Sequence, residues 1–175
     1  LQRPIGVLVD ALRQLGAEVR YKGEEGFPPL RIVGRSNLSR GTLRVSANIS
    51  SQYLSALLMI APTLEKGLTL VLTGRIVSRP YLEMTIRMMR TFGAQVEWTD
   101  EHTISVEPGG YHAMSYTIEN DWSAASYWYE IVSLTDDPDA YVMLPGLQLH
   151  SLQGDSCVRD IFAALGVTTE ECTCS

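Results

Sequence analysis

A helix ending that recurs three times limits the folds open to this chain. Each ending is an apolar residue, a glycine and a small apolar residue: Leu15-Gly16-Ala17, Phe92-Gly93-Ala94 and Leu165-Gly166-Val167. Gly93 follows Gly16 by 77 positions, and Gly166 follows Gly93 by 73. Glycine stops helices because it adopts the left-handed conformation without strain. Three endings in register predict a long structural unit repeated along the chain, with a period beyond that of common solenoids.

Hydrophobic patterns predict the elements of each copy. Predicted strands lie at 17–21, 30–33, 43–47, 67–74, 95–98, 103–106, 115–119 and 141–144, and predicted helices at 4–15, 50–59, 78–92, 121–131 and 155–165. The order predicts an α/β protein whose copies are βαβαββ units. In the last helix, Val158, Ile161, Phe162 and Leu165 are predicted to line one inward face.

The polar residues that could carry chemistry stand at predicted helix starts. Ser50, Ser51 and Gln52 open the second helix directly after a strand, Ser78 and Tyr81 open the third, Asp121 opens the fourth, and Arg3 precedes the first. The first turn of a helix offers free N–H groups and a positive dipole end, which suit anions. If the copies stack alike, these starts converge on one cleft suited to a small polyanion.

Simpler interpretations stay open for each of these residues. Ser50 or Ser51 can be an N-cap alone, because serine caps helices well. Asp121 can also be only a cap, Arg3 a surface arginine, and Tyr81 a core aromatic with a satisfied hydroxyl.

Composition narrows the classes of function. The 175 residues are 45% hydrophobic and 19% charged, which is enough to build a core, and the net charge of −6 argues against nonspecific nucleic-acid or membrane binding. The spacing of the three histidines and three cysteines predicts no metal site, and no glycine-rich phosphate loop occurs. Cys157, Cys172 and Cys174 are expected to be reduced thiols in a cytoplasmic protein. The chain begins without Met and stops inside a predicted strand, so we expect a piece of a longer protein.

Several motifs in a fixed order extend this interpretation. They are Arg3-Pro4-Ile5, Phe27-Pro28-Pro29-Leu30, Ser50-Ser51-Gln52, Val77-Ser78-Arg79-Pro80-Tyr81 and Asp121-Trp122-Ser123-Ala124-Ala125-Ser126-Tyr127. Over nearly its whole length the chain resembles the family of 5-enolpyruvylshikimate-3-phosphate synthases, the 3-phosphoshikimate 1-carboxyvinyltransferases of the shikimate pathway, which serves aromatic amino-acid biosynthesis.

The resemblance implies a fold and a reaction. The fold is an inside-out α/β barrel of βαβαββ units, the enolpyruvyl transferase fold, with two domains of three units. Residues 1–119 would be the later part of the first domain and residues 120–175 the start of the second. The reaction moves the enolpyruvyl group of phosphoenolpyruvate to the 5-hydroxyl of shikimate 3-phosphate and releases phosphate, without metal or organic cofactor. The full-length protein is expected to be a monomer.

The resemblance also assigns roles to residues. Ser50, Ser51, Gln52, Ser78 and Tyr81 would bind shikimate 3-phosphate, Arg3 would bind phosphoenolpyruvate, and Asp121 would be catalytic, near the reacting centre. Two departures matter. Trp122 is larger than the residue often found there, and the family's lysine, phosphoenolpyruvate loop and later acid–base residues are absent. The chain alone is therefore expected to be inactive.

Two other classes of function stay open at this point. One is a non-catalytic module of the same fold that binds small anions. The other is a sister fold of the RNA 3′-phosphate cyclase type, against which stand the acidic net charge and the lack of a basic patch.

Overall fold

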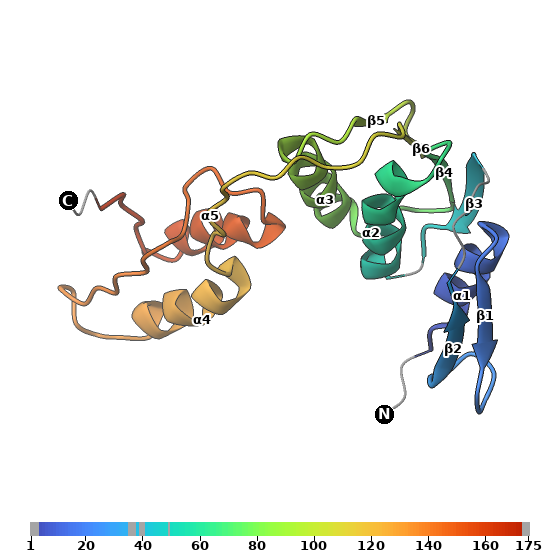
Figure 1. Cartoon of the computed structure of the whole chain (residues 1–175). Helices are drawn as coiled ribbons and strands as arrows, with labels where there is room; N and C mark the ends of the chain where they lie inside the picture. Colours follow the sequence, from blue (N-terminus) through green and yellow to red (C-terminus); the bar gives the residue numbers. More distant parts are fainter. Residues whose placement is uncertain (1–3, 35–37, 39–40, 49, 173–175) are drawn as a thin grey trace. The chain divides into compact units, whose positions relative to one another are not determined.

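The computed structural model describes residues 4–34, 38, 41–48 and 50–172, and these form two compact units, Leu1–Met114 and Ser115–Ser175. Figure 1 shows the helices and strands of both units, coloured along the sequence. The predicted domain boundary at 119/120 is a different division from this one, and it stays a prediction.

The first unit contains one complete βαβαββ copy. It runs through β3 (Thr42–Ser46), α2 (Ser51–Ile60), the short helix η1 (Ala61–Thr63), β4 (Leu68–Thr73), α3 (Arg79–Thr91), β5 (Val96–Trp98) and β6 (Thr103–Val106). The sheet order is β3-β4-β6-β5, with β3 and β4 parallel and the other neighbours antiparallel. Before it come α1 (Gly6–Gln14) and the antiparallel pair β1 (Glu18–Tyr21) and β2 (Leu30–Val33). The predicted unit is therefore confirmed.

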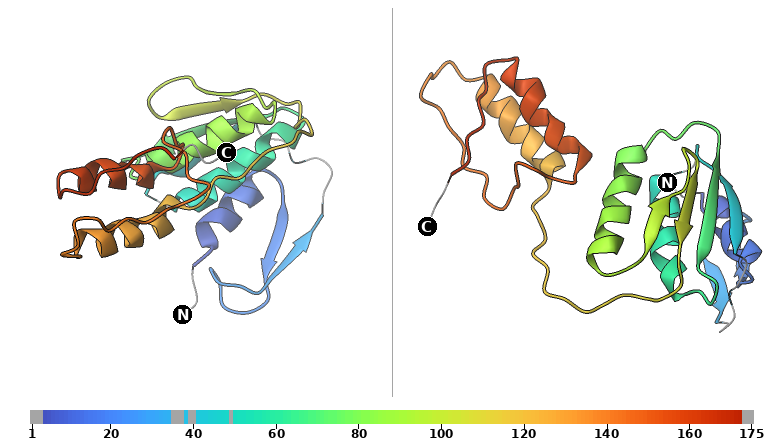
Figure 2. Two further views of the ribbon diagram at one scale, coloured as in Figure 1. Left: turned by 90° about the vertical axis from the view of Figure 1, so that its left-hand side faces the viewer. Right: turned by 90° about the horizontal axis from the view of Figure 1, so that it is seen from above.

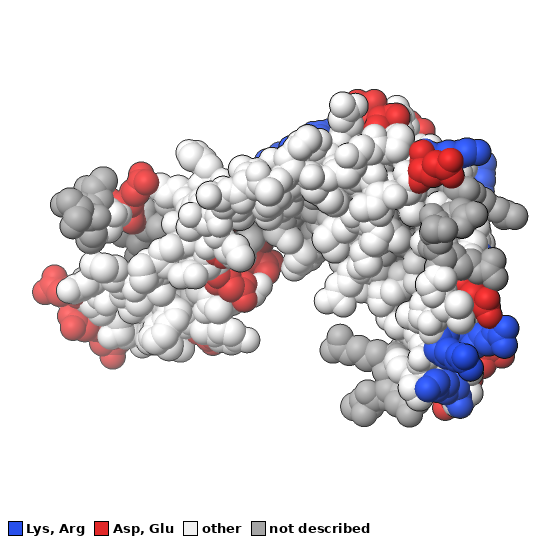
Figure 3. All heavy atoms as spheres, viewed as in Figure 1, with Lys and Arg blue, Asp and Glu red and all other residues white. Residues whose placement is uncertain are grey.

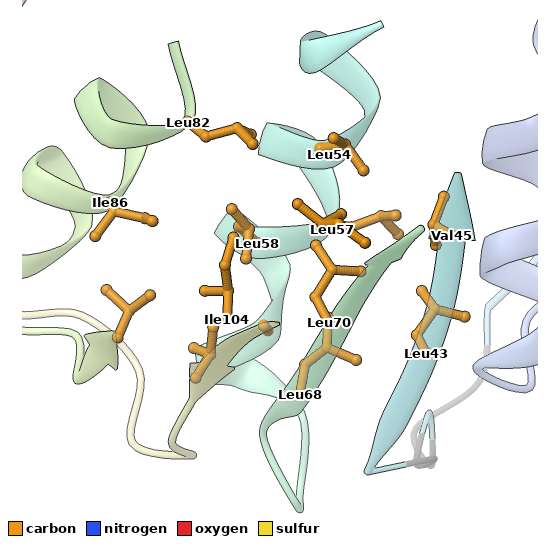
Figure 4. Close-up of a cluster of buried hydrophobic side chains, with 14 of the residues drawn as sticks. Leu43, Val45, Leu54, Leu57, Leu58, Leu68, Leu70, Leu82, Ile86 and Ile104 are labelled. Carbon is orange, nitrogen blue, oxygen red and sulfur yellow. The ribbon is translucent and has the colours of Figure 1, made fainter. Parts of the chain in front are cut away.

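The core of this unit lies between one face of the four-stranded sheet and helices α2 and α3. Alternate residues of β4 are buried, as the two-residue period of a strand requires. The two helices lie side by side on that face (Figure 2). Figure 4 shows how their side chains meet those of the sheet: Leu54, Leu57, Leu58, Leu82 and Ile86 from the helices, and Leu43, Val45, Leu68, Leu70 and Ile104 from the strands.

The three helix endings share one backbone geometry, which confirms the predicted glycine stops. Gly16, Gly93 and Gly166 have φ values of 100°, 89° and 90°. In each case the N–H of the residue after the glycine donates back across the turn, from Ala17 to Leu12, from Ala94 to Met89 and from Val167 to Phe162, at 2.9, 2.9 and 3.1 Å. This six-residue closure satisfies a carbonyl that the helix end would leave unpaired.

A side chain should cost more at Gly93 than at Gly166, where a Cβ would meet nothing within 4 Å. At Gly93 a Cβ would clash with Cδ2 of His112, in addition to the strain of a positive φ. We expect Gly93→Ala to destabilise the first unit by about 2–3 kcal/mol. Urea unfolding followed by circular dichroism measures the loss. Adding His112→Ala should recover the steric part, about 1 kcal/mol; no recovery would mean that the backbone strain is the whole cost.

The second unit is built on two helices. These are α4 (Trp122–Ser133) and α5 (Val158–Ala163), the latter preceded by the short helix η2 (Gly154–Cys157). Trp122 is 1% exposed, and with Ala125, Tyr129 and Val158 it forms a small core. The rings of Tyr129 and Phe162 lie 5.7 Å apart.

Three predictions about individual segments are wrong. The first helix begins at Gly6 with Ile5 as its N-cap, so Pro4 precedes the helix. Residues 115–119 and 141–144 form no strands, because they lack a ladder of backbone bonds. Ile161 and Leu165 are 58% and 65% exposed, because α5 ends at Ala163 and turns only Val158 and Phe162 toward α4.

A trace of the repeat remains where those strands were expected. In the first unit, Ala47 N–H donates to Thr73 O at 2.8 Å, just beyond the end of β3. In the second, Asn120 N–H donates to Gly146 O at 2.8 Å, 73 positions further along for both residues. The two segments therefore meet at the equivalent point, although one bond is too few to make a strand pair.

Candidate functional site

The sheet brings two of the polar helix starts together. Because β3 and β4 are parallel neighbours, their carboxyl ends lie at the same edge of the sheet. Helix α2 begins five residues after β3, and α3 begins six residues after β4. Ser50, Ser51 and Gln52 therefore share this edge with Ser78 and Tyr81. In α/β sheets such an edge is the usual place for ligands.

At the start of α2, Ser50 is the N-cap. Its hydroxyl accepts a hydrogen bond from Gln52 N–H at 3.3 Å, so the capping interpretation of Ser50 is confirmed. Ser51 is half-buried and the Gln52 side chain is exposed. Capping uses one lone pair of Ser50 and leaves its own O–H available as a donor.

The start of α3 differs from that of α2. Ser78 occupies the N-cap position but makes no side-chain capping bond, and Pro80 supplies the fixed φ of the first turn. Tyr81 is 46% exposed, so the interpretation of Tyr81 as a core aromatic is wrong. The Ser78 hydroxyl and the Tyr81 ring are therefore free of the capping and packing roles that could have explained them.

Two hydrogen bonds tie these helix starts to their surroundings. One turn into the helices, Ser55 Oγ and Thr85 Oγ1 lie 2.8 Å apart, which joins α2 to α3. Tyr53 OH donates to Pro4 O at 2.7 Å, which joins α2 to the segment before α1. Arg3 itself lies outside the described residues. Neither of these two hydrogen bonds was predicted from the sequence, although a serine inside the apolar run 54–60 was a usable signal.

Asp121 belongs to the second unit. It is the N-cap of α4 and accepts from Ser123 N–H at 2.8 Å, so it does act as a cap. The Ser123 hydroxyl donates to Asp155, which places a second carboxylate at the same helix start. Asp121 is exposed on the second unit.

Glu119 organises the segments around that helix start. Its Oε1 accepts from Trp122 Nε1 at 2.7 Å and from Gln148 N–H at 2.8 Å, and its Oε2 accepts from Ser151 Oγ at 2.7 Å. Partial burial raises the pKa of this carboxyl, but hydrogen bonds from Ser151, Gln148, Trp122 and Gln153 outweigh it and hold the pKa below the usual range of a glutamate. Gln153 also accepts from Trp122 N–H and donates to Asn120 O.

Charge divides unevenly between the two units. Residues 1–114 carry 13 Lys and Arg against 10 Asp and Glu, a net +3, and residues 115–175 carry one against 10, a net −9. On the face drawn in Figure 3 the second unit shows Asp and Glu but no Lys or Arg. The unit that holds the α2 and α3 starts is thus the one whose field favours an anion.

The described part of the chain contains no cluster of three His, Cys, Asp or Glu side chains placed to hold a metal ion. None of the helices described there is both long and apolar enough to cross a membrane.

Comparison with known proteins identifies the family. A family model described as EPSP synthase (3-phosphoshikimate 1-carboxyvinyltransferase) matches residues 1–173. The 3-phosphoshikimate 1-carboxyvinyltransferase of Bacteroides fragilis is 54% identical over 169 residues, which cover 97% of this chain and 40% of that protein. The one from Erwinia tasmaniensis is 40% identical over 171 residues, which cover 97% and 39%. A solved EPSP synthase from Acinetobacter baumannii matches with a TM-score of 0.59 and 25% identity, over 76% of this chain and 29% of that one.

The repeated unit, with its helices on one face of the sheet, is that of the inside-out α/β class, as the structural match supports. Within that class the chain belongs to the EPSP synthase family. It spans about 40% of the length of the relatives that it matches. The family match decides against the RNA 3′-phosphate cyclase type.

Proposed function

We propose that this chain is part of an enzyme that transfers the enolpyruvyl group of phosphoenolpyruvate to the 5-hydroxyl of shikimate 3-phosphate and releases phosphate. The observation that carries the proposal is the pair of polar helix starts, α2 and α3, at one edge of the sheet in the positively charged unit. Membership of the EPSP synthase family names the reaction, and the names of the relatives agree with it.

The proposed roles follow the chemistry of the residues. Ser50, Ser51, Gln52, Ser78 and Tyr81 bind shikimate 3-phosphate, since hydroxyl and amide groups at helix starts add donors where the dipole favours negative charge. Arg3 binds phosphoenolpyruvate, because a guanidinium fork matches carboxylate and phosphate oxygens. Asp121 exchanges a proton near the reacting carbon.

The test is a chimera in which this chain replaces the matching segment of the Bacteroides fragilis protein. The two sequences are 54% identical over 169 residues, which makes that protein a suitable recipient for the graft. We expect steady release of phosphate from phosphoenolpyruvate that depends on shikimate 3-phosphate, and no turnover by the chain alone.

The unaltered Bacteroides fragilis protein is the positive control. A folded chimera that binds shikimate 3-phosphate in calorimetry but releases no phosphate would contradict the enzymatic proposal. That outcome would favour the non-catalytic module that binds small anions.

A further inference from the structure

A pair of hydroxyls joins the two helix starts of the candidate site. Ser55 stands on α2 one turn after Ser51, and Thr85 stands on α3 one turn after Tyr81. Their side-chain oxygens lie 2.8 Å apart, and both residues are half-buried. Leu54, Leu58 and Leu82 surround the helix contact, so the pair is a polar bond at the rim of an apolar interface.

The direction of the hydrogen bonds follows from counting protons. Thr85 Oγ1 donates to Tyr81 O at 2.9 Å, and a hydroxyl has one proton to give. Ser55 is therefore the donor to Thr85. The bonds form a chain from α2 through Thr85 to the backbone of Tyr81, which is itself a proposed substrate-binding residue. The chain fixes how far the first turn of α3 lies from the first turn of α2.

We propose that Ser55 and Thr85 are positioning residues for shikimate 3-phosphate: their bond sets the spacing of the two helix starts that bind it. The inference rests on the proposed function. Apolar side chains behind the pair also pack α2 against α3, so we expect the helices to stay in contact without the bond. The bond adds a preferred distance and angle between the two helices, because a hydrogen bond weakens steeply away from its ideal geometry. Contacts between leucine side chains have no such directional preference.

The test uses the chimera with Ser55→Ala, Thr85→Val and the double variant. We expect each single change to raise the KM and the calorimetric Kd for shikimate 3-phosphate about fivefold, the equivalent of one hydrogen bond. The KM for phosphoenolpyruvate should change less than about twofold. The double variant should be no worse than Thr85→Val, because that variant already removes the bond that Thr85 shares with Ser55. Thr85→Ser, which keeps the hydroxyl, should restore binding.

Thr91→Val is the matched control. Thr91 stands near the other end of α3, and its hydroxyl donates to Arg87 O at 3.0 Å, the same bond back along the helix. This variant should leave the binding of shikimate 3-phosphate unchanged.

Melting temperatures that fall with no change in the Kd would overturn the positioning role and leave a structural one. Additive effects in the double variant would also overturn it. Failure of the proposed function would give a different result, in which the chimera binds shikimate 3-phosphate without turnover. The Kd values of the variants would then still test whether Ser55 and Thr85 position the ligand. No binding by the unmodified chimera would overturn both.

Discussion

Replacing Asp121 by asparagine should lower the kcat of the chimera about a hundredfold or more and leave its melting temperature almost unchanged. The Asp121 side chain accepts from Ser123 N–H at 2.8 Å, and an asparagine oxygen caps a helix equally well. The neutral amide, however, neither takes up nor gives up a proton in the working pH range. The substitution therefore separates the two roles that Asp121 could have.

Two controls complete this experiment. Asp121→Ala removes the cap as well, and should lower both kcat and, by about 1 kcal/mol, the stability. Asp155→Asn neutralises the other carboxylate at the same helix start, which accepts from Ser123 Oγ, and should retain most of the turnover. Full activity of Asp121→Asn would show that Asp121 is a cap and that the proton is handled elsewhere.

The parts of the fold that the sequence predicts are those governed by local rules. The glycine endings at 16, 93 and 166 were predictable because the left-handed turn needs no distant partner. Strand alternation predicted β4 and the hairpin of β5 and β6, which find partners within about 40 residues. The same alternation at 115–119 and 141–144 produced no strands, because a strand requires a ladder.

The candidate site divides in the same way. Ser50 and Ser78 were found because a helix start is marked by its own residues, and the parallel pairing of β3 and β4 then placed both at one edge. The bond between Ser55 and Thr85 could not be predicted in this way. It depends on how α2 packs against α3, and the two residues are 30 positions apart in the sequence. Glu119 was missed for a similar reason: two of its donors, Gln148 and Ser151, lie in the segment 148–153, which has no periodic pattern.

Removing the Glu119 carboxylate should strongly lower the stability of the second unit. Glu119→Leu should destabilise the second unit by about 2–4 kcal/mol, because it leaves donors on Trp122, Gln148 and Ser151 without their acceptor. Glu119→Gln should cost about 1 kcal/mol, since an amide oxygen can still accept while the Ser151 hydroxyl turns to accept from the amide. Glu130→Gln, an exposed change on α4, is the control for lost charge.

The pH dependence of this unit gives the same network a second readout. Because the folded pKa of Glu119 lies below its pKa in the unfolded chain, the carboxylate contributes stability at every pH above the unfolded pKa. That contribution is lost as the pH falls through the lowered pKa, when the protonated group no longer accepts well from its donors. Urea unfolding of the second unit, with the indole N–H signal of Trp122 as the probe, should show an acid decline that Glu119→Gln flattens. An equal decline in the variant would assign the acid sensitivity to other carboxylates and leave Glu119 as a contact without a titrating role.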